Sequence, residues 1–155
     1  MTDAPAIANV VVHVGDMDRA LAFYRDALGL SVRFDSGWNS PAPMLALSGT
    51  AEGTAMRIVA LELSGTAGLS LCSFGEDASS RPAFESAGTI HFGLSVADLP
   101  TTLAALESAG GQRLGEPGIV GPPDRRVTLA FVRDPDGAVV ELVQHMSAQN
   151  VEGGN

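Results

Sequence analysis

Two stretches of the chain decide its fold: NVVVHVGDMDRALAFYRDALGL at residues 9–30 and HFGLSVADLPTTLAALESAGGQ at residues 91–112. A shift of 82 residues lays the first over the second. The positions that then coincide are Val14 and Val96, Asp16 and Asp98, Leu21 and Leu103, Ala22 and Ala104, Ala27 and Ala109, and Gly29 and Gly111. An internal repeat of this kind indicates two copies of one structural unit.

Each copy has the pattern of a strand followed by a helix. The apolar run at the start of each copy predicts a strand, and Asp16 or Asp98 then stands where an N-cap residue accepts hydrogen bonds from the first helical N–H groups. The spacing of Leu and Ala after each aspartate gives the helix one apolar face. Gly29 in the first copy and Gly110 with Gly111 in the second can adopt the left-handed backbone conformation that ends a helix.

Further strands follow each helix. The first copy offers strands at residues 31–36, 56–63 and 68–74, and the second offers a strand near Arg113 and others at 126–134 and 138–145. The DPDG turn at 134–137 has proline and glycine where they close a hairpin. We expect residues 36–44 to form a loop, 75–88 a linker and 146–155 a frayed tail. The predicted fold class is α+β, with the order βαβββ twice.

Composition limits the partners and the compartment. The chain has 155 residues, the size of one domain, and its net charge of −9 argues against nucleic acid as a partner. No apolar run approaches the roughly 20 residues that cross a bilayer, so no membrane partner is expected. The opening MTDAPAIANV is not typical of a secretory signal, and the single cysteine, Cys72, has no partner for an internal disulfide. These features favour a soluble protein of the cytoplasm.

The repeat, with VGDMDRALAFYRDALGL in one copy and HFGLSVADL followed by FVRDPDGAVVELVQ in the other, resembles the vicinal oxygen chelate superfamily over about residues 7–145. That group includes glyoxalase I, extradiol dioxygenases and bleomycin-binding proteins. The resemblance implies a single domain of two βαβββ modules, at about 7–74 and 89–145. They form a curved, partly closed mixed sheet around one cavity, with the helices outside. It also implies a homodimer and a small-molecule substrate or ligand.

The resemblance also implies a set of candidate metal ligands. In metal-using relatives the ligand on the first strand of each module lies seven residues before the capping aspartate, which gives His91 in the second copy and Asn9 in the first. The last strand of each module supplies an acidic residue, which matches Glu141 but meets Ser70 in the first copy. His91 and Glu141 would hold a divalent Zn, Fe, Mn or Ni ion, with Asn9 as a weaker oxygen ligand and Ser70 beside a bound water.

Strand alternation supports this placement for the second copy. His91 shares a strand face with Gly93, whereas Phe92 and Leu94 face the helix. Glu141 would then stand among apolar neighbours, where a carboxylate needs a cation or a hydrogen-bond partner. Two interpretations stay open at this point. His91 and Glu141 hold a metal or act directly in catalysis, or they satisfy one another as an inherited polar pair without any cofactor.

Four other residues are candidates for substrate binding. His13 lies four residues beyond Asn9 on the same strand face, and the resemblance implies a substrate contact near the cavity mouth; the alternative is a solvent-touching histidine beside a helix cap. Arg125 and Arg126 follow the stretch GEPGIVGPPD at 115–124, which the resemblance places as a loop over the cavity, so they could clamp a carboxylate or be ordinary surface charge. For Trp38 two interpretations stay open: its side chain lines the cavity inside the curved sheet, or it only covers the edge of that sheet.

Two classes of function follow. The first is an enzyme with lyase, isomerase or oxygenase chemistry on a small oxygenated substrate, with Glu141, His91 and His13 as catalytic residues and Asn9 and Ser70 in contact with the substrate. The second is a non-catalytic protein that sequesters a toxic or cationic compound, as bleomycin-binding members do. The acidic charge favours the second class, and the pairing of an imidazole with a carboxylate favours the first.

Overall fold

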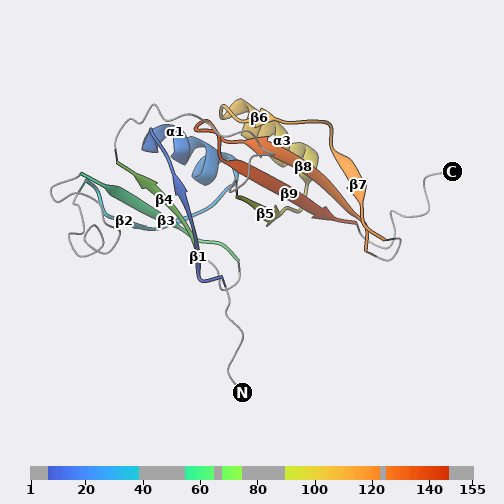
Figure 1. The fold of residues 1–155 in the computed structure, drawn as a ribbon, viewed down its shortest axis with the longest axis horizontal. Helices are drawn as coiled ribbons and strands as arrows, with labels where there is room; N and C mark the ends of the chain where they lie inside the picture. Colours follow the sequence, from blue (N-terminus) through green and yellow to red (C-terminus); the bar gives the residue numbers. More distant parts are fainter. Residues whose placement is uncertain (1–6, 39–54, 65–67, 75–89, 123–124, 147–155) are drawn as a thin grey trace, which may run out of the picture. The chain divides into compact units, whose positions relative to one another are not determined.

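The fold is described from a computed structural model, which covers residues 7–38, 55–64, 68–74, 90–122 and 125–146 (Figure 1). The chain divides into two compact units, Met1–Ser80 and Arg81–Asn155, which follow the two predicted copies. The predicted linker at 75–88, the predicted loop from residue 39 onward and the tail from residue 147 onward lie outside the described residues. The description of the chain as a single domain stays a prediction.

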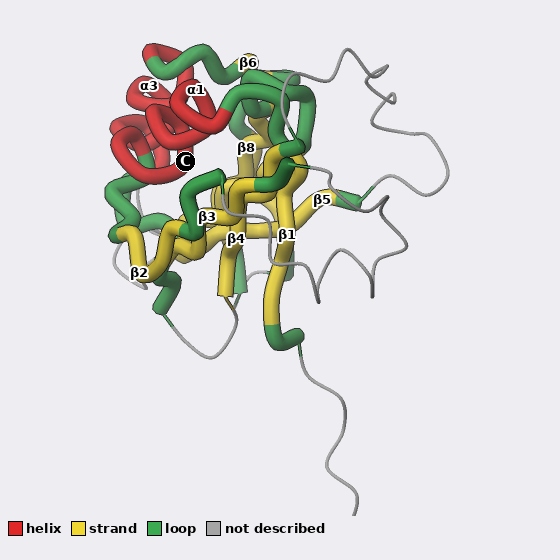
Figure 2. The backbone as a smooth tube through the Cα atoms, turned by 90° about the vertical axis from the view of Figure 1, so that its left-hand side faces the viewer, coloured by secondary structure: helices red, strands yellow, loops and turns green. Residues whose placement is uncertain are grey.

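The first unit contains one mixed sheet and one helical segment. Its elements are β1 (Asn9–His13), α1 (Met17–Leu21), η1 (Ala22–Ala27), β2 (Val32–Asp35), β3 (Arg57–Leu61) and β4 (Gly68–Ser73). The strands lie side by side in the order β1-β4-β3-β2 (Figure 2). The strands β1 and β4 pair in parallel, and the other neighbours pair antiparallel. The βαβββ order predicted for this copy is confirmed.

The helical segment of the first unit has two parts. Asp16 caps α1 as predicted, because its Oδ1 accepts from the backbone N–H groups of Asp18 and Arg19 at 3.0 Å each. The second part, η1, is a π-helix rather than the regular helix expected from the spacing. Its wider turns carry Phe23 and Tyr24, which are fully buried and pack edge to face with ring centroids 4.9 Å apart.

The second unit repeats this arrangement. Its elements are β5 (His91–Ser95), α3 (Leu99–Ser108), β6 (Gln112–Arg113), β7 (Gly118–Val120), β8 (Val127–Arg133) and β9 (Val139–His145). The strand order is β5-β9-β8-β6, with β5 and β9 parallel and β7 paired antiparallel with β8. The expected loop at 115–124 therefore contains a strand, because the β-branched residues Ile119 and Val120 favour extended pairing over an open loop.

The helix α3 begins and ends as the sequence predicts. Asp98 accepts a hydrogen bond from the backbone N–H of Thr101 at 3.0 Å, and this bond holds the pKa of the Asp98 carboxyl below its ordinary value. At the other end Gly110 adopts φ of +90°, and the N–H of Gly111 donates to the carbonyl of Leu106 at 2.8 Å. The helix is thus fixed between its capping aspartate and its glycines.

One face of each sheet is buried and the other is accessible. The buried faces carry aliphatic side chains that pack beneath the helical segments: Val59, Leu61, Leu69 and Leu71 in the first unit, and Val132, Val140 and Leu142 in the second. The alternation of side chains along each strand then leaves the polar residues Asn9 and His13, and likewise His91, on the opposite face. Within the described ranges, no helix is long and apolar enough to cross a membrane.

The DPDG hairpin between β8 and β9 depends on a buried carboxylate. Asp134 is almost fully buried, and its Oδ1 accepts from the backbone N–H groups of Asp136 at 3.0 Å and Ala138 at 2.8 Å. Gly137 has φ of +101°, a conformation that favours glycine. This turn sets the register of β9, the strand that carries Glu141.

We predict that Asp134→Ala lowers the free energy of unfolding by about 1–3 kcal/mol, because two partly buried backbone N–H groups lose their acceptor. Urea denaturation followed by circular dichroism measures the change. The control is Asp26→Ala, which removes an exposed carboxylate paired with Arg25 and should cost less than about 1 kcal/mol. Equal losses in the two variants would contradict the role given to Asp134.

Candidate functional site

The second unit brings His91 and Glu141 together on the sheet face that lies opposite α3. His91 opens β5, and Glu141 stands in the parallel neighbour β9, where it is paired with Gly93. The Nε2 atom of His91 lies 3.5 Å from Oε2 of Glu141, and the two side chains are 40% and 23% exposed. Two residues separated by fifty positions in the sequence therefore form one accessible polar pair.

The surroundings of this pair are apolar and open. Phe131 of β8 is paired with Glu141 and presents its ring at right angles to His91, with centroids 5.6 Å apart. At Gly93 a Cβ atom would lie 3.7 Å from Oε2 of Glu141, so a side chain at this position would fill space beside the carboxylate. The glycine keeps one side of Glu141 accessible.

The pair has the geometry of two neighbouring metal ligands. Nitrogen and oxygen donors bound at about 2.1 Å around a tetrahedral ion stand about 3.4 Å apart, close to the separation of His91 and Glu141. Among the described residues no group of three His, Cys, Asp or Glu side chains gathers around a common point. The residues therefore fit one side of a divalent metal site, and further ligands would have to be other oxygen donors.

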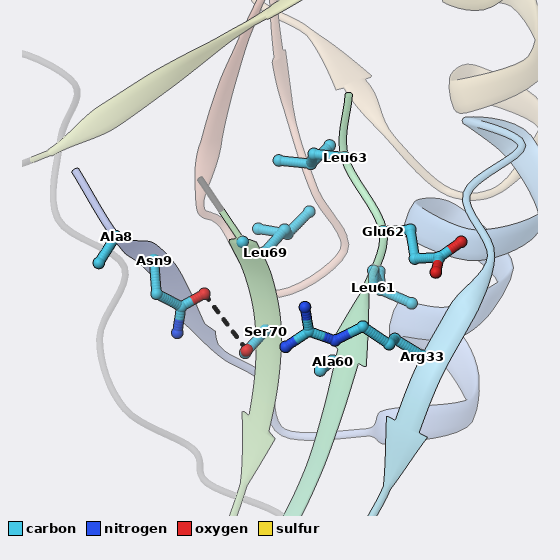
Figure 3. A pocket seen from close by; sticks show the side chains of 10 residues that line it. Ala8, Asn9, Arg33, Ala60, Leu61, Glu62, Leu63, Leu69 and Ser70 are labelled. Carbon is cyan, nitrogen blue, oxygen red and sulfur yellow. Dashed lines mark hydrogen bonds between the residues drawn. The ribbon is translucent and has the colours of Figure 1, made fainter. Parts of the chain in front are cut away.

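The first unit repeats the geometry with neutral groups. Asn9 opens β1, and Ser70 stands in the parallel neighbour β4; the Ser70 hydroxyl donates to Oδ1 of Asn9 at 3.4 Å (Figure 3). Gly68 is paired with Asn9, and a Cβ atom there would approach Oδ1 of Asn9 to 3.0 Å. The first unit thus holds an amide and a hydroxyl where the second holds an imidazole and a carboxylate.

The remaining sequence candidates lie at separate places. His13, at the other end of β1 from Asn9, is exposed and stacks on Phe74 with ring centroids 5.8 Å apart and planes 9° from parallel. Trp38 follows β2 and is exposed. Arg125 and Arg126 precede β8 and are exposed, and the carbonyl of Arg126 accepts from the N–H of Met146. Their roles in substrate binding stay predictions.

One residue that the sequence analysis did not single out, Arg33, lines a pocket of about 500 Å³ in the first unit. The pocket lies where β1 and β4 begin and β3 ends, and its polar lining comes from Asn9, Ser70, Arg33 and Glu62 (Figure 3). A charged residue inside the otherwise apolar run VRF at 32–34 was the available signal. Strand alternation alone did not reveal it, because the pairing of β2 is irregular between Val32 and Phe34.

Comparison with known proteins agrees with this architecture. Residues 6–142 match the model of the glyoxalase/bleomycin resistance protein/dioxygenase superfamily. The chain belongs to this superfamily. A probable lactoylglutathione lyase of Synechocystis is 29% identical over 93% of this chain and 98% of its own length. A lactoylglutathione lyase of Haemophilus influenzae is 27% identical over 93% of this chain and 96% of its own.

Solved structures support the fold. A glyoxalase family protein from Bacillus cereus superposes with a TM-score of 0.76 at 18% identity, over 94% of this chain and 97% of that one. The resemblance inferred from the sequence is confirmed, and so are the α+β class and the two βαβββ modules, the second of which has the additional short strand β7. The two relatives are named as lyases, which favours the enzyme over the sequestering protein.

Cys72 belongs to the interior and not to the site. Its side chain is only 4% exposed and packs with Met56 and Ile58, and burial raises the pKa of its thiol. At a given pH a smaller fraction of the buried thiol is therefore ionised, and access for a reagent is restricted as well.

We predict that Cys72 reacts with a disulfide reagent at least about tenfold more slowly in the folded protein than in concentrated urea, because the thiolate is the nucleophile. Because the chain has a single cysteine, the released chromophore reports this one site. A free small thiol in the same urea solution corrects for the effect of urea on the reagent. Equal rates in the folded and unfolded protein would show that Cys72 is accessible.

Proposed function

We propose that this protein is a lyase of the lactoylglutathione-lyase type, which interconverts the hemithioacetal of an α-oxoaldehyde and the thioester of an α-hydroxy acid. The observation that carries the proposal is the pair of His91 and Glu141, 3.5 Å apart on the accessible sheet face of the second unit. The names of the two lyase relatives supply the substrate class. A thiol adduct of methylglyoxal is the substrate that we would test first.

The two compounds are isomers that differ only in the positions of hydrogen atoms, so the reaction needs a base and no external oxidant. The Glu141 carboxylate takes the proton from the carbon that bears sulfur, and the electron pair of that C–H bond moves toward the neighbouring carbonyl oxygen. The same carboxyl group then returns that proton to the second carbon, while the hydroxyl proton on the sulfur-bearing carbon passes to the oxygen of the second carbon. The acyl thioester results, with every atom conserved.

We propose that a divalent metal ion is held by His91 and Glu141; the sequence resemblance adds Asn9 as a weaker oxygen ligand. The observation that supports this is the donor separation of 3.5 Å, which suits two neighbouring ligands of one ion. When bound, the ion would act as a Lewis acid toward the oxygens of the substrate. His91 also orients the Glu141 carboxylate, and its own ring is held edge-on by Phe131.

The other candidate residues take supporting roles in this proposal. His13 contacts the substrate or carries a proton, and Ser70, Trp38, Arg125 and Arg126 contact substrate groups away from the reacting carbons. We also propose that the protein works as a homodimer in the cytoplasm. Exposed apolar side chains on the first unit, Val11 and Phe34 among them, support an association with a second copy.

We predict that Glu141→Gln lowers kcat for thioester formation from methylglyoxal and glutathione by about 10²–10⁴, because the amide keeps the shape but cannot accept the proton. The ultraviolet absorbance of the thioester measures the rate at saturating Zn²⁺, Ni²⁺, Mn²⁺ or Fe²⁺. The control is Glu107→Gln, which changes an acid of α3 paired with Arg113 and should leave kcat within about twofold. A wild-type protein that forms no thioester with any of the four ions contradicts the lyase proposal.

We predict that His91→Ala abolishes the rise in thermal midpoint that Ni²⁺ or Zn²⁺ gives to the wild-type protein, because a ligand that binds only the folded state stabilises it. The measurement is thermal unfolding with and without the ion, together with the metal content of dialysed protein. The matched control is His145→Ala, which removes an exposed imidazole from β9 and should keep the full shift. A His91→Ala protein with the wild-type shift would place the ion elsewhere.

A further inference from the structure

The pocket of the first unit and the His91–Glu141 pair present different polar groups, and they therefore suit ligands of different charge. It occupies about 500 Å³, within the range of small-molecule sites, and it combines the polar groups of Asn9, Ser70, Arg33 and Glu62 with apolar atoms of Leu63 and other residues. The second unit places an imidazole and a carboxylate at the corresponding strand positions, which suits a cation. The first unit places neutral hydrogen-bonding groups there and adds a guanidinium.

Arg33 is the cation of this pocket. It lies in β2 at the irregular pairing between Val32 and Phe34, and in Figure 3 its guanidinium extends toward Ser70. Among the described residues no ion pair or hydrogen bond to the Arg33 side chain is found. The acid of the same strand, Asp35, is bound instead by Arg57, with Nη2 and Oδ2 2.7 Å apart. The guanidinium can therefore offer its paired N–H donors to a carboxylate from solution.

The carboxylate of Glu62 does not pair with the Arg33 guanidinium among the contacts that the structure describes. Glu62 also lines the pocket, but Figure 3 shows its carboxylate pointing away from the Arg33 guanidinium. No ion pair between Glu62 and Arg33 is found among the residues that the structure describes. The Arg33 guanidinium is therefore the charged group of the pocket that extends toward Ser70 (Figure 3).

The contact between the Ser70 hydroxyl and Oδ1 of Asn9 is a long hydrogen bond of 3.4 Å, and it indicates which groups are available to a ligand. The Ser70 hydroxyl donates to Oδ1 of Asn9, so the lone pairs of the hydroxyl oxygen stay available as acceptors. The Asn9 amide has its carbonyl oxygen engaged, so its NH₂ group is available as a donor. Side by side, the two residues therefore offer one donor and one acceptor, the complement of a single hydroxyl group.

We propose that this pocket binds an α-hydroxy carboxylate. Its carboxylate pairs with the guanidinium of Arg33, and its hydroxyl donates to Ser70 and accepts from the Asn9 amide. The apolar lining around Leu63 accommodates an aliphatic substituent of the ligand. The inference goes beyond the proposed lyase activity: the pocket shares Asn9 and Ser70 with the contacts proposed for that activity, but its binding of the hydroxy acid needs Arg33 and neither His91 nor Glu141.

Three probes separate the contributions of the ligand groups. The probes are α-hydroxyisocaproate, isocaproate, which lacks the hydroxyl, and α-hydroxyisocaproamide, which lacks the charge. We expect saturable binding of α-hydroxyisocaproate to the full-length wild-type protein by NMR titration, with shifts at the backbone amides of Asn9 and Gly68. Isocaproate should bind about fivefold more weakly, and the amide should show no saturable binding. Equal affinity for all three probes, shifts only at other amides, or no binding of α-hydroxyisocaproate would overturn the proposal.

Two variants test the residues. Arg33→Gln should weaken binding of α-hydroxyisocaproate at least about tenfold, because a charge-assisted pair is lost. Arg25→Gln makes the same change at an arginine paired with Asp26 outside the pocket and should leave the affinity within about twofold. Ser70→Ala should reduce the affinity for α-hydroxyisocaproate to that for isocaproate. An Arg33→Gln protein that binds as tightly as the wild type would show that the guanidinium does not hold the ligand.

Discussion

Parallel pairing between the first and last strands of each unit is the constraint on which the candidate sites depend. In β1–β4 and in β5–β9 the chain returns after a helix and two or more further strands to lie beside its own start. Parallel strands cannot be joined by a short hairpin, so this pairing needs the intervening elements. The pairing brings residues about fifty to sixty positions apart onto one face, with their polar atoms 3.4–3.5 Å apart. Without it, Asn9 and Ser70 would be as separate as their sequence positions suggest.

The duplicated pairing explains how one scaffold carries two chemistries. The backbone positions of Asn9 and Ser70 correspond to those of His91 and Glu141, and the polar atoms stand 3.4 and 3.5 Å apart in the two pairs. Only the side chains differ. A strand register is costly to change, because a shift of one residue would turn every side chain to the other face. Substitution at fixed register therefore exchanges an imidazole and a carboxylate for an amide and a hydroxyl without altering the strands.

Much of this could be predicted from the sequence because it depends on local rules. The alternation of apolar residues placed His91 on the accessible face, and the resemblance to the superfamily, through the seven-residue count back from Asp98 and the V-E-L pattern, singled out His91 and Glu141. The sequence analysis did not find β7, the π-helical turns of η1 or the orientation of Arg33. Each of these depends on contacts outside the element itself: β7 pairs with the following strand β8, Phe23 and Tyr24 of η1 are buried in the core, and β2 pairs irregularly with β3 at Arg33. The spacing of apolar residues along the sequence does not predict such contacts.

The separation of His91 and Glu141 also bears on whether they form a closed polar pair. A completed N–H···O hydrogen bond has a heavy-atom distance of about 2.7–3.2 Å, and a charge-assisted one is shorter. At 3.5 Å the imidazole and the carboxylate are too far apart for a strong bond between them, and both side chains remain partly exposed. The Glu141 carboxylate, beside Phe131 and Val143 but 23% exposed, therefore has room for a partner closer than His91. The missing side chain at Gly93 leaves space for such a partner on one side.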